Sequence, residues 1–128
     1  MKLADITAAA ISKNPNLEVE VEQEGKDDVT VVFRNPMLMP EKERQAAQGI
    51  FETADEIMKA DNQDSMIRRE AEVLKSALSK VVADKKHITL LERIFSANQD
   101  TRDAAWIALY GEYQDKVQPG EASPSQKH

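Results

Sequence analysis

The feature that most constrains the fold is an unbroken alternation of apolar and acidic residues over 17–22, which reads Leu-Glu-Val-Glu-Val-Glu. Successive side chains of a strand point to opposite faces, so this segment predicts a strand with one apolar and one acidic face. Residues 23–28 predict a turn, and residues 29–34 supply a second strand with an apolar face of its own. A two-stranded hairpin alone is marginally stable in water. We therefore expect a β-hairpin over about 17–34 whose apolar face lies on helices or on another subunit's strands.

The remainder of the chain predicts helices. Residues 3–12 carry a short helical pattern that ends before Pro15, because the residue that precedes a proline disfavours the helical region. Between about 40 and 117 the apolar residues recur every three or four positions, which predicts a bundle of about four helices. Two of these helices carry heptad-like seams, formed by Ala47, Phe51, Ala54 and Met58 and by Ile67, Ala71, Leu74, Leu78 and Val81. Seams this short favour a helical hairpin within one chain over an intermolecular coiled coil.

The C-terminal part divides into a last helix and a tail. Asp100 or Thr101 is the expected N-terminal cap of the last helix. Residues 118–128 contain proline, glycine and serine but no large apolar side chain to bury, so they predict a disordered tail. The expected fold class is α+β and mostly α: an N-terminal β-hairpin, then the helical bundle, in a single domain over 1–117.

Composition argues against several classes of function. The chain has no cysteine and two histidines, so thiolate chemistry is excluded and a catalytic triad or a histidine-rich metal site lacks parts. Its formal net charge of −6 disfavours nucleic acid and an anionic membrane surface as partners. Asp5 interrupts the stretch that a secretory signal would need, and no apolar run approaches the length of a membrane span.

Cofactor and metal signatures are not apparent either. The acidic run over 18–22 is interpreted as the solvent face of a strand rather than as a cation site. Residues 61–64 resemble the start of a calcium loop, but Met66 stands where such a loop needs glycine. The glycines are too far apart to form a phosphate-binding loop. We expect no catalytic site, no metal and no cofactor.

Two segments offer candidate partner-binding residues. The candidates are Trp106, Leu109, Tyr110 and Tyr113 on the last helix, and Met37, Leu38 and Met39 in the connector that follows the hairpin. The aromatic stripe is typical of core packing, which is the favoured interpretation, and the alternative is a docking face for a partner. The connector has the same two interpretations: it caps the core, or it forms an adaptable apolar contact.

The order of these elements resembles a known family. The chain has a hairpin strand with the sequence Asp-Val-Thr-Val-Val-Phe-Arg over 28–34, followed by helices. Its last helix ends in Tyr-Gly-Glu-Tyr-Gln over 110–114 and leads into Gln-Pro-Gly-Glu-Ala-Ser-Pro-Ser over 118–125. In layout over 17–125, and in residues mainly over 109–125, the chain is similar to the tail assembly chaperones of long-tailed bacteriophages, especially those that infect actinobacteria.

The resemblance implies a function without a catalytic residue. Such chaperones coat the long, apolar tape measure protein in the host cytoplasm, keep it soluble until tube subunits replace them, and are absent from the mature virion. Self-association is also expected. In many phages a frameshift near the end of this gene appends a second domain, for which a disordered tail would be a suitable junction. The alternatives are a phage or bacterial structural protein, such as a head–tail joining or a tail component, that stays in the particle, and, far behind, a small enzyme or metal-dependent regulator.

Overall fold

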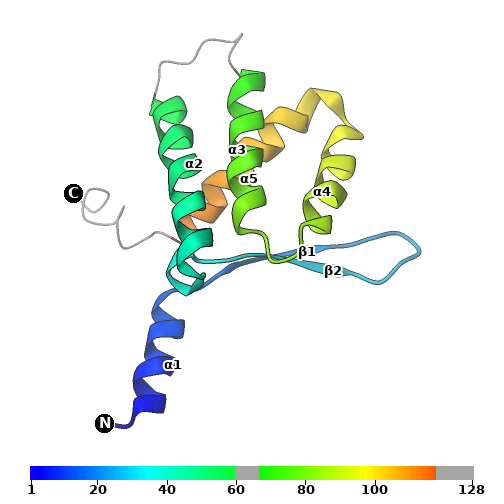
Figure 1. The fold of residues 1–128 in the computed structure, drawn as a ribbon. Coiled ribbons are helices and arrows are strands. Elements are labelled where there is room, and N and C mark those ends of the chain that lie inside the picture. The colour runs from blue at the N-terminus through cyan, green and yellow to red at the C-terminus, as the bar shows by residue number, and fades with distance from the viewer. Residues whose placement is uncertain (60–66, 118–128) are drawn as a thin grey trace, which may run out of the picture.

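The computed structural model describes residues 1–59 and 67–117. The predicted tail over 118–128 and the expected polar link between the second and third helices lie outside these residues. The elements are α1 (Leu3–Lys13), β1 (Leu17–Val21), β2 (Val29–Phe33), the 3-10 helix η1 (Pro36–Leu38), α2 (Glu41–Lys59), α3 (Ile67–Val81), α4 (Lys86–Ser96) and α5 (Gln99–Val117) (Figure 1). The predicted class is confirmed: the fold is α+β and mostly α, with a hairpin followed by a helical bundle.

The hairpin forms within the chain. β1 and β2 pair antiparallel in a register that sets Val19 opposite Val31 and Glu20 opposite Thr30. Gly25 has a φ of 74° in the connecting turn, a conformation that glycine adopts at little cost. Val31 and Phe33 are fully buried, while Glu20 is exposed, as the alternating pattern predicts.

β2 is also paired on its second edge, which the sequence did not indicate. The Arg34 amide donates to the Val81 carbonyl at 3.0 Å, and the Ala83 amide donates to the Val32 carbonyl at 2.8 Å. The segment that joins α3 to α4 therefore pairs with the edge of β2 that faces away from β1, so that it forms a short third segment beside the two strands. The hairpin and the bundle are connected through these main-chain bonds as well as through side-chain packing.

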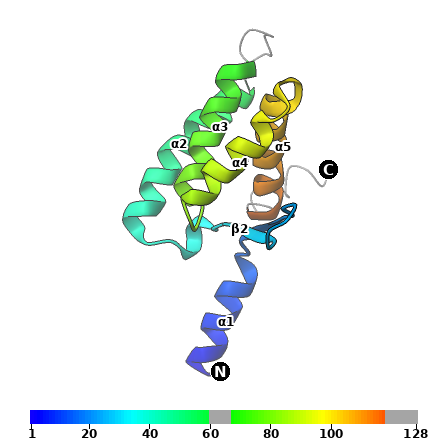
Figure 2. The same cartoon turned by 90° about the vertical axis from the view of Figure 1, so that its right-hand side faces the viewer.

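The helices enclose one apolar core. α2 and α3 run antiparallel side by side, as the matched seams predict, and α5 crosses them on the far side (Figures 1 and 2). Ala47 and Phe51 of α2, and Leu74 and Leu78 of α3, are buried. The hairpin and α5 contribute the buried aromatic rings beside Phe51, and the Phe33 and Tyr113 rings meet edge to face at 6.4 Å. Aromatic pairs in this geometry stabilise the fold modestly, beyond the contribution of their buried surface area.

The predicted cap of the last helix is wrong by two residues or more. α5 begins at Gln99, so Asp100 and Thr101 lie inside its first turn. The side-chain oxygen of Asn98 accepts the Asp100 amide at 3.1 Å, which is the bond that a capping residue makes. Asparagine is as good a cap as aspartate, and Asn98 stands only two residues before Asp100, so the residue types alone do not distinguish them.

Candidate protein-binding surface

The aromatic stripe of α5 lies in the core and not on a docking face. Trp106, Tyr110 and Tyr113 are 0%, 2% and 1% exposed. Leu109 is partly buried and packs against the same core. As partner-binding candidates the three aromatic residues are therefore corrected, because the folded chain does not present their side chains to another protein, whereas Leu109 keeps part of its surface exposed. The other interpretation, that such a stripe is how a terminal helix docks on its own domain, holds here.

The chemistry around the tyrosines is structural. The Tyr113 hydroxyl donates to the Arg34 carbonyl at 2.9 Å and so joins α5 to the end of the hairpin. Burial, with Tyr110 beside it, raises the pKa of Tyr113 above its ordinary value. Burial and the nearby carboxylate of Asp55 raise the pKa of Tyr110 as well. Both hydroxyls therefore stay protonated, and neither has the lowered pKa of an activated group.

The three apolar residues of the connector have different roles: one caps the core and two remain exposed. Met39 is buried at 3% exposure and caps the core, whereas Met37 is 62% exposed and Leu38 is 40% exposed. The cause lies in Asn35, whose side-chain oxygen accepts the Met37 amide at 3.0 Å and starts the short helix η1. That turn directs Met39 inward and leaves Met37 and Leu38 as the most exposed of the predicted candidates.

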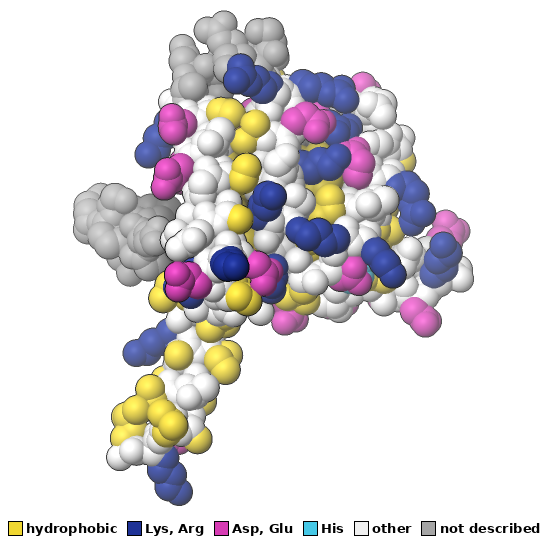
Figure 3. Space-filling model, in the orientation of Figure 1, with side chains coloured by type: hydrophobic (Ala, Val, Ile, Leu, Met, Phe, Trp, Pro, Cys, Tyr) yellow, Lys and Arg dark blue, Asp and Glu magenta, His cyan; other side chains and the backbone are white. Residues whose placement is uncertain are grey.

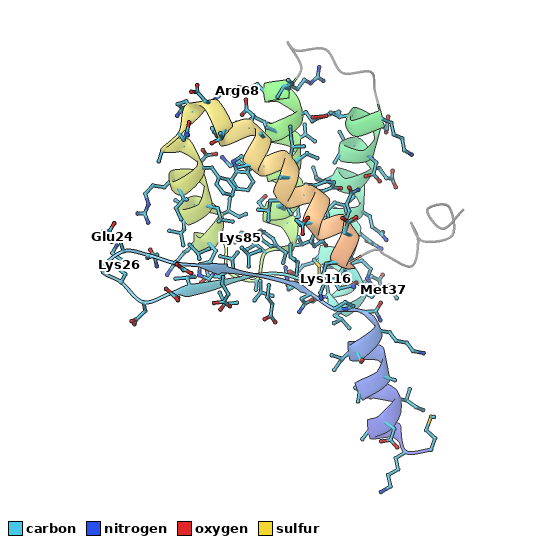
Figure 4. All side chains as sticks on the ribbon, turned by 180° about the vertical axis from the view of Figure 1, so that it is seen from behind. Glu24, Lys26, Met37, Arg68, Lys85 and Lys116 are labelled. Carbon is cyan, nitrogen blue, oxygen red and sulfur yellow. The ribbon has the colours of Figure 1, made fainter. Side chains whose placement is uncertain are left out.

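Leu38 lines a hollow where α1 leaves the body of the molecule. We call this feature the root hollow. Its volume is about 500 Å³, and its lining residues are Ile11, Asn14, Pro15, Asn16, Leu17, Glu18, Leu38 and Lys116. Figure 4 shows Lys116 and Met37 at the end of the body from which α1 projects. The hollow has apolar walls from three elements and one charged group of each sign.

Asn35 fixes the walls of the root hollow. Its buried side-chain amide donates to the carbonyls of Pro15 and Val117, each at 3.2 Å. Its main-chain amide donates to the side-chain oxygen of Asn16 at 2.7 Å. One side chain thus ties the segment after α1 to the last turn of α5. The hollow is preformed, which lowers the entropic cost of binding.

α1 itself exposes an apolar surface. None of its residues is buried, and it projects from the body in both views (Figures 1 and 2). Leu3, Ile6 and Ile11 are 78%, 51% and 55% exposed. In Figure 3 apolar side chains cover much of this projecting helix. Contiguous exposed apolar surface on a small protein is typical of a site for protein contact.

Sequence reasoning named Met37 and Leu38 but missed Ile11 and Leu17. These two residues belong to different predicted elements, on either side of the Asn14-Pro15-Asn16 break. The sequence did contain a local sign of the site, because each predicted element carries an apolar residue near the end that faces this break. What the sequence could not show is that η1 returns to the same place.

A cluster of charged side chains joins α3, α4 and α5 away from the root hollow. Arg102 donates to Glu92 on α4, to Glu72 on α3 and to Asp103, with nitrogen–oxygen distances of 2.7–2.9 Å. Lys75 also reaches Glu92 at 2.7 Å. Hydrogen bonds from Arg102 lower the pKa of Glu92 to about 2. Every acid here has a basic partner, which is the arrangement of a structural clamp.

Groups suited to metal or proton chemistry do not converge within 1–59 and 67–117. No three histidine, aspartate or glutamate side chains there are placed to hold a metal ion. His87 is a quarter exposed, and its Nε2 lies 3.9 Å from an oxygen of Asp84, with Lys85 and Lys86 beside it in the chain. In the same part of the chain, none of the helices combines the length and the apolar character needed to cross a membrane.

Comparison with known proteins identifies no relative. The chain matches no protein-family model, no curated protein and no solved structure. A function must therefore be argued from the surface itself, and the root hollow with the neighbouring Met37 is its most distinctive part.

Proposed function

We propose that this protein is a bacteriophage tail assembly chaperone that binds the tape measure protein in the host cytoplasm and keeps it soluble until the tail tube replaces it. It acts by binding, without a chemical step, and leaves before the virion is complete. The observation that carries this proposal is the root hollow with Leu38 in its wall and Met37 beside it. The resemblance over 109–125 supplies the identity of the client.

The exposed apolar residues lie outside the buried core. The core is closed by Met39 and the buried residues of the hairpin and helices, whereas Met37, Leu38 and Ile11 remain outside it. Exposed apolar side chains lower solubility, so their retention beside a preformed hollow supports a contact function. Methionine and leucine adapt to varied apolar surfaces, which suits a client with many similar helical segments.

The shape of the site suits an amphipathic helix. Apolar side chains of a client helix would lie against Ile11, Leu17 and Leu38, in the manner of helix-in-groove recognition. Glu18 and Lys116 at the rim offer one partner for a charge of each sign. Such rim charges contribute orientation more than affinity.

The acidic face of the hairpin supports the same role. Glu20 of β1 and Glu22, which follows the strand, are exposed and do not line the root hollow, in a chain of net charge −6. Many copies along one client would repel neighbouring coated clients and so oppose aggregation. Apolar surface toward the client and negative charge toward solvent is the arrangement that a solubilising coat needs.

The test is co-expression with the tape measure protein of the phage that encodes this chain. We expect the wild-type chain to increase the soluble fraction of that client, and Leu38→Asp or Met37→Asp to remove most of the increase. Ile94→Asp is a matched control, because Ile94 is 39% exposed, as Leu38 is 40% exposed, but lies on α4. An unchanged soluble fraction with the wild-type chain would refute the proposed function. Equal losses in Leu38→Asp and Ile94→Asp would refute the proposed site.

The second candidate function is a structural protein that remains in the virion. It is favoured by the outer edge of β1: the pairing register leaves the main-chain groups of Glu18 and Glu20 pointing away from β2, and no main-chain bond from another described residue reaches them. An open edge can add a strand from a neighbouring subunit in a permanent assembly. Mass spectrometry of purified virions separates the two candidates, since the structural protein would be present and the chaperone absent.

A further inference from the structure

α1 does not pack into the core formed by the other elements of residues 1–59 and 67–117. It is 11 residues long and buries none of them. Isolated helices of this length are marginal in water, so α1 gains little from standing alone. The hydrogen bonds of Asn35 to Pro15 and Asn16 hold the root of α1 against the body. The helix is thus presented to solvent as a projecting element, which suggests that another molecule covers it.

One side of α1 is hollowed and carries charges of opposite sign. We call this the α1 hollow. Its volume is about 360 Å³, and it is lined by Met1, Asp5, Ile6, Ala9, Ala10 and Lys13. The small side chains at its centre allow the backbone of another helix to approach closely. Asp5 lies four residues before Ala9 and Lys13 lies four residues after it. These charges are therefore placed symmetrically about the centre, about 12 Å apart along the helix axis.

This arrangement is complementary to itself. When two copies of α1 run antiparallel with Ala9 facing Ala9, Asp5 of each lies opposite Lys13 of the other. Ile6 of each helix then lies at the level of Ser12 of the other. A parallel pair would instead set Lys13 against Lys13 and Asp5 against Asp5. The same surface on both copies, related by a two-fold axis, is the usual form of a symmetric dimer contact.

We infer that α1 is a self-association element, which pairs antiparallel with α1 of a second copy across the α1 hollow. The occupant of this surface is a second copy because the charges match in pairs under a two-fold rotation. An unrelated partner would not require that symmetry. Ile11, the α1 residue in the wall of the root hollow, lies on the opposite side of the helix from Ala9, so the pair leaves that wall uncovered.

The sharpest test reverses the charges one at a time. In the full-length chain, Asp5→Lys makes the α1 hollow entirely basic, and Lys13→Asp makes it entirely acidic. We expect sedimentation velocity to show self-association of the wild type that is about tenfold weaker in each single variant, since each change replaces two attractive contacts by repulsive ones. An equimolar mixture of the two variants should associate again, because every contact between unlike chains is attractive. The doubly substituted chain should also recover.

Recovery separates charge pairing from loss of the helix. Asp5 accepts the Lys2 amide at 3.4 Å near the start of α1, so Asp5→Lys weakens the helix as well as the pair. Were helix stability the only factor, the doubly substituted chain would associate less than either single variant. Asp27→Lys on the hairpin turn is the matched control for net charge, and it should associate as the wild type does. Trp106, which is fully buried, reports by its fluorescence that each body remains folded.

A second test uses the absence of cysteine from the chain. Ala9→Cys places one thiol near the two-fold axis, so mild oxidation should yield a disulfide-linked dimer. Ala4→Cys lies on the opposite side of the helix and should remain largely uncrosslinked. Equal crosslinking of the two variants overturns the proposal, and so does a wild-type chain that stays monomeric or a charge-variant mixture that associates no better than its components. These outcomes concern the isolated chain and are independent of whether it solubilises the tape measure protein.

Discussion

Arg102 and Glu92 form a two-bond fork between α5 and α4, in which Nε of Arg102 lies 2.9 Å from one carboxylate oxygen and Nη2 lies 2.7 Å from the other. Arg102 is 5% exposed. A guanidinium this buried is stabilised only while its carboxylate partners remain in place. The fork therefore fixes how α4 packs against the rest of the bundle.

Replacement of Arg102 should be strongly destabilising. Arg102→Ala leaves the carboxylates of Glu92, Glu72 and Asp103 close together without their shared partner, and we expect a loss of about 3 kcal/mol in the free energy of unfolding. Urea unfolding followed by Trp106 fluorescence measures it. Arg68→Ala is the control, since Arg68 is exposed on α3 and its removal should change stability by about 0.5 kcal/mol or less. Similar losses in the two variants would contradict the clamp.

The same fork makes stability depend on pH in the acid range. The pKa of Glu92 is about 2 in the folded chain, below its ordinary value of 4.5, chiefly because of its hydrogen bonds with Arg102. The unfolded chain therefore binds this proton more readily, so the contribution is fully present above about pH 4.5 and is lost as the pH falls toward 2. In Glu92→Gln, the free energy of unfolding should fall less steeply as the pH decreases from 4.5 toward 2. In Glu52→Gln, on the exposed face of α2, the pH dependence of the free energy of unfolding should be that of the wild type.

The amide of Asn35 should be irreplaceable by a carboxylate. Asn35→Asp keeps the acceptor for Met37 but turns two lone pairs toward the carbonyls of Pro15 and Val117, which now lack their donor. We expect a loss of about 2 kcal/mol and faster amide hydrogen exchange in α1 and at the end of α5. Asn98→Asp is the matched control, because its oxygen only accepts a helix-start amide. That variant should be neutral or slightly more stable.

Replacement of two glycines by alanine should change the stability of the fold in opposite directions. Gly49 lies inside α2 with open space where a Cβ would stand, so Gly49→Ala should stabilise the chain by about 1 kcal/mol. Gly25 has a φ of 74°, so Gly25→Ala should destabilise it by about 1 kcal/mol despite equally open space. Thermal unfolding of the two variants compares them directly. A gain from Gly25→Ala would mean that the turn adopts another conformation.

The elements could be predicted because each depends on a local pattern. The alternation over 17–22 identified the first strand, and the seams through Phe51 and Leu74 identified the two antiparallel helices. Both patterns work because one face of an amphipathic element must be buried. The orientation of the aromatic stripe toward the core followed from the same rule, and its alternative as a docking face was wrong.

The contacts that organise the surface could not be predicted, because they join residues far apart in the chain. Arg102 is one of several basic residues near a helix start, and nothing near it in sequence indicates that Glu72 on α3 faces it. Asn35 is one asparagine before a proline, and its partners stand 20 and 82 residues away. The sequence of the connector also could not show which of its apolar residues is buried. Its three large apolar residues look alike, and only the turn started by Asn35 decides that Met39 goes inward.

The bond between Asn35 and the Val117 carbonyl also fixes the position at which α5 ends. It holds the last residue of α5 beside Pro15 in the wall of the root hollow. Any polypeptide fused after Val117 would start at the site where we expect the client to bind. A tethered domain acts at an effective concentration set by its linker, so even a weak affinity for the client would become substantial there. A longer product of this gene would hold both of its modules on the same stretch of client.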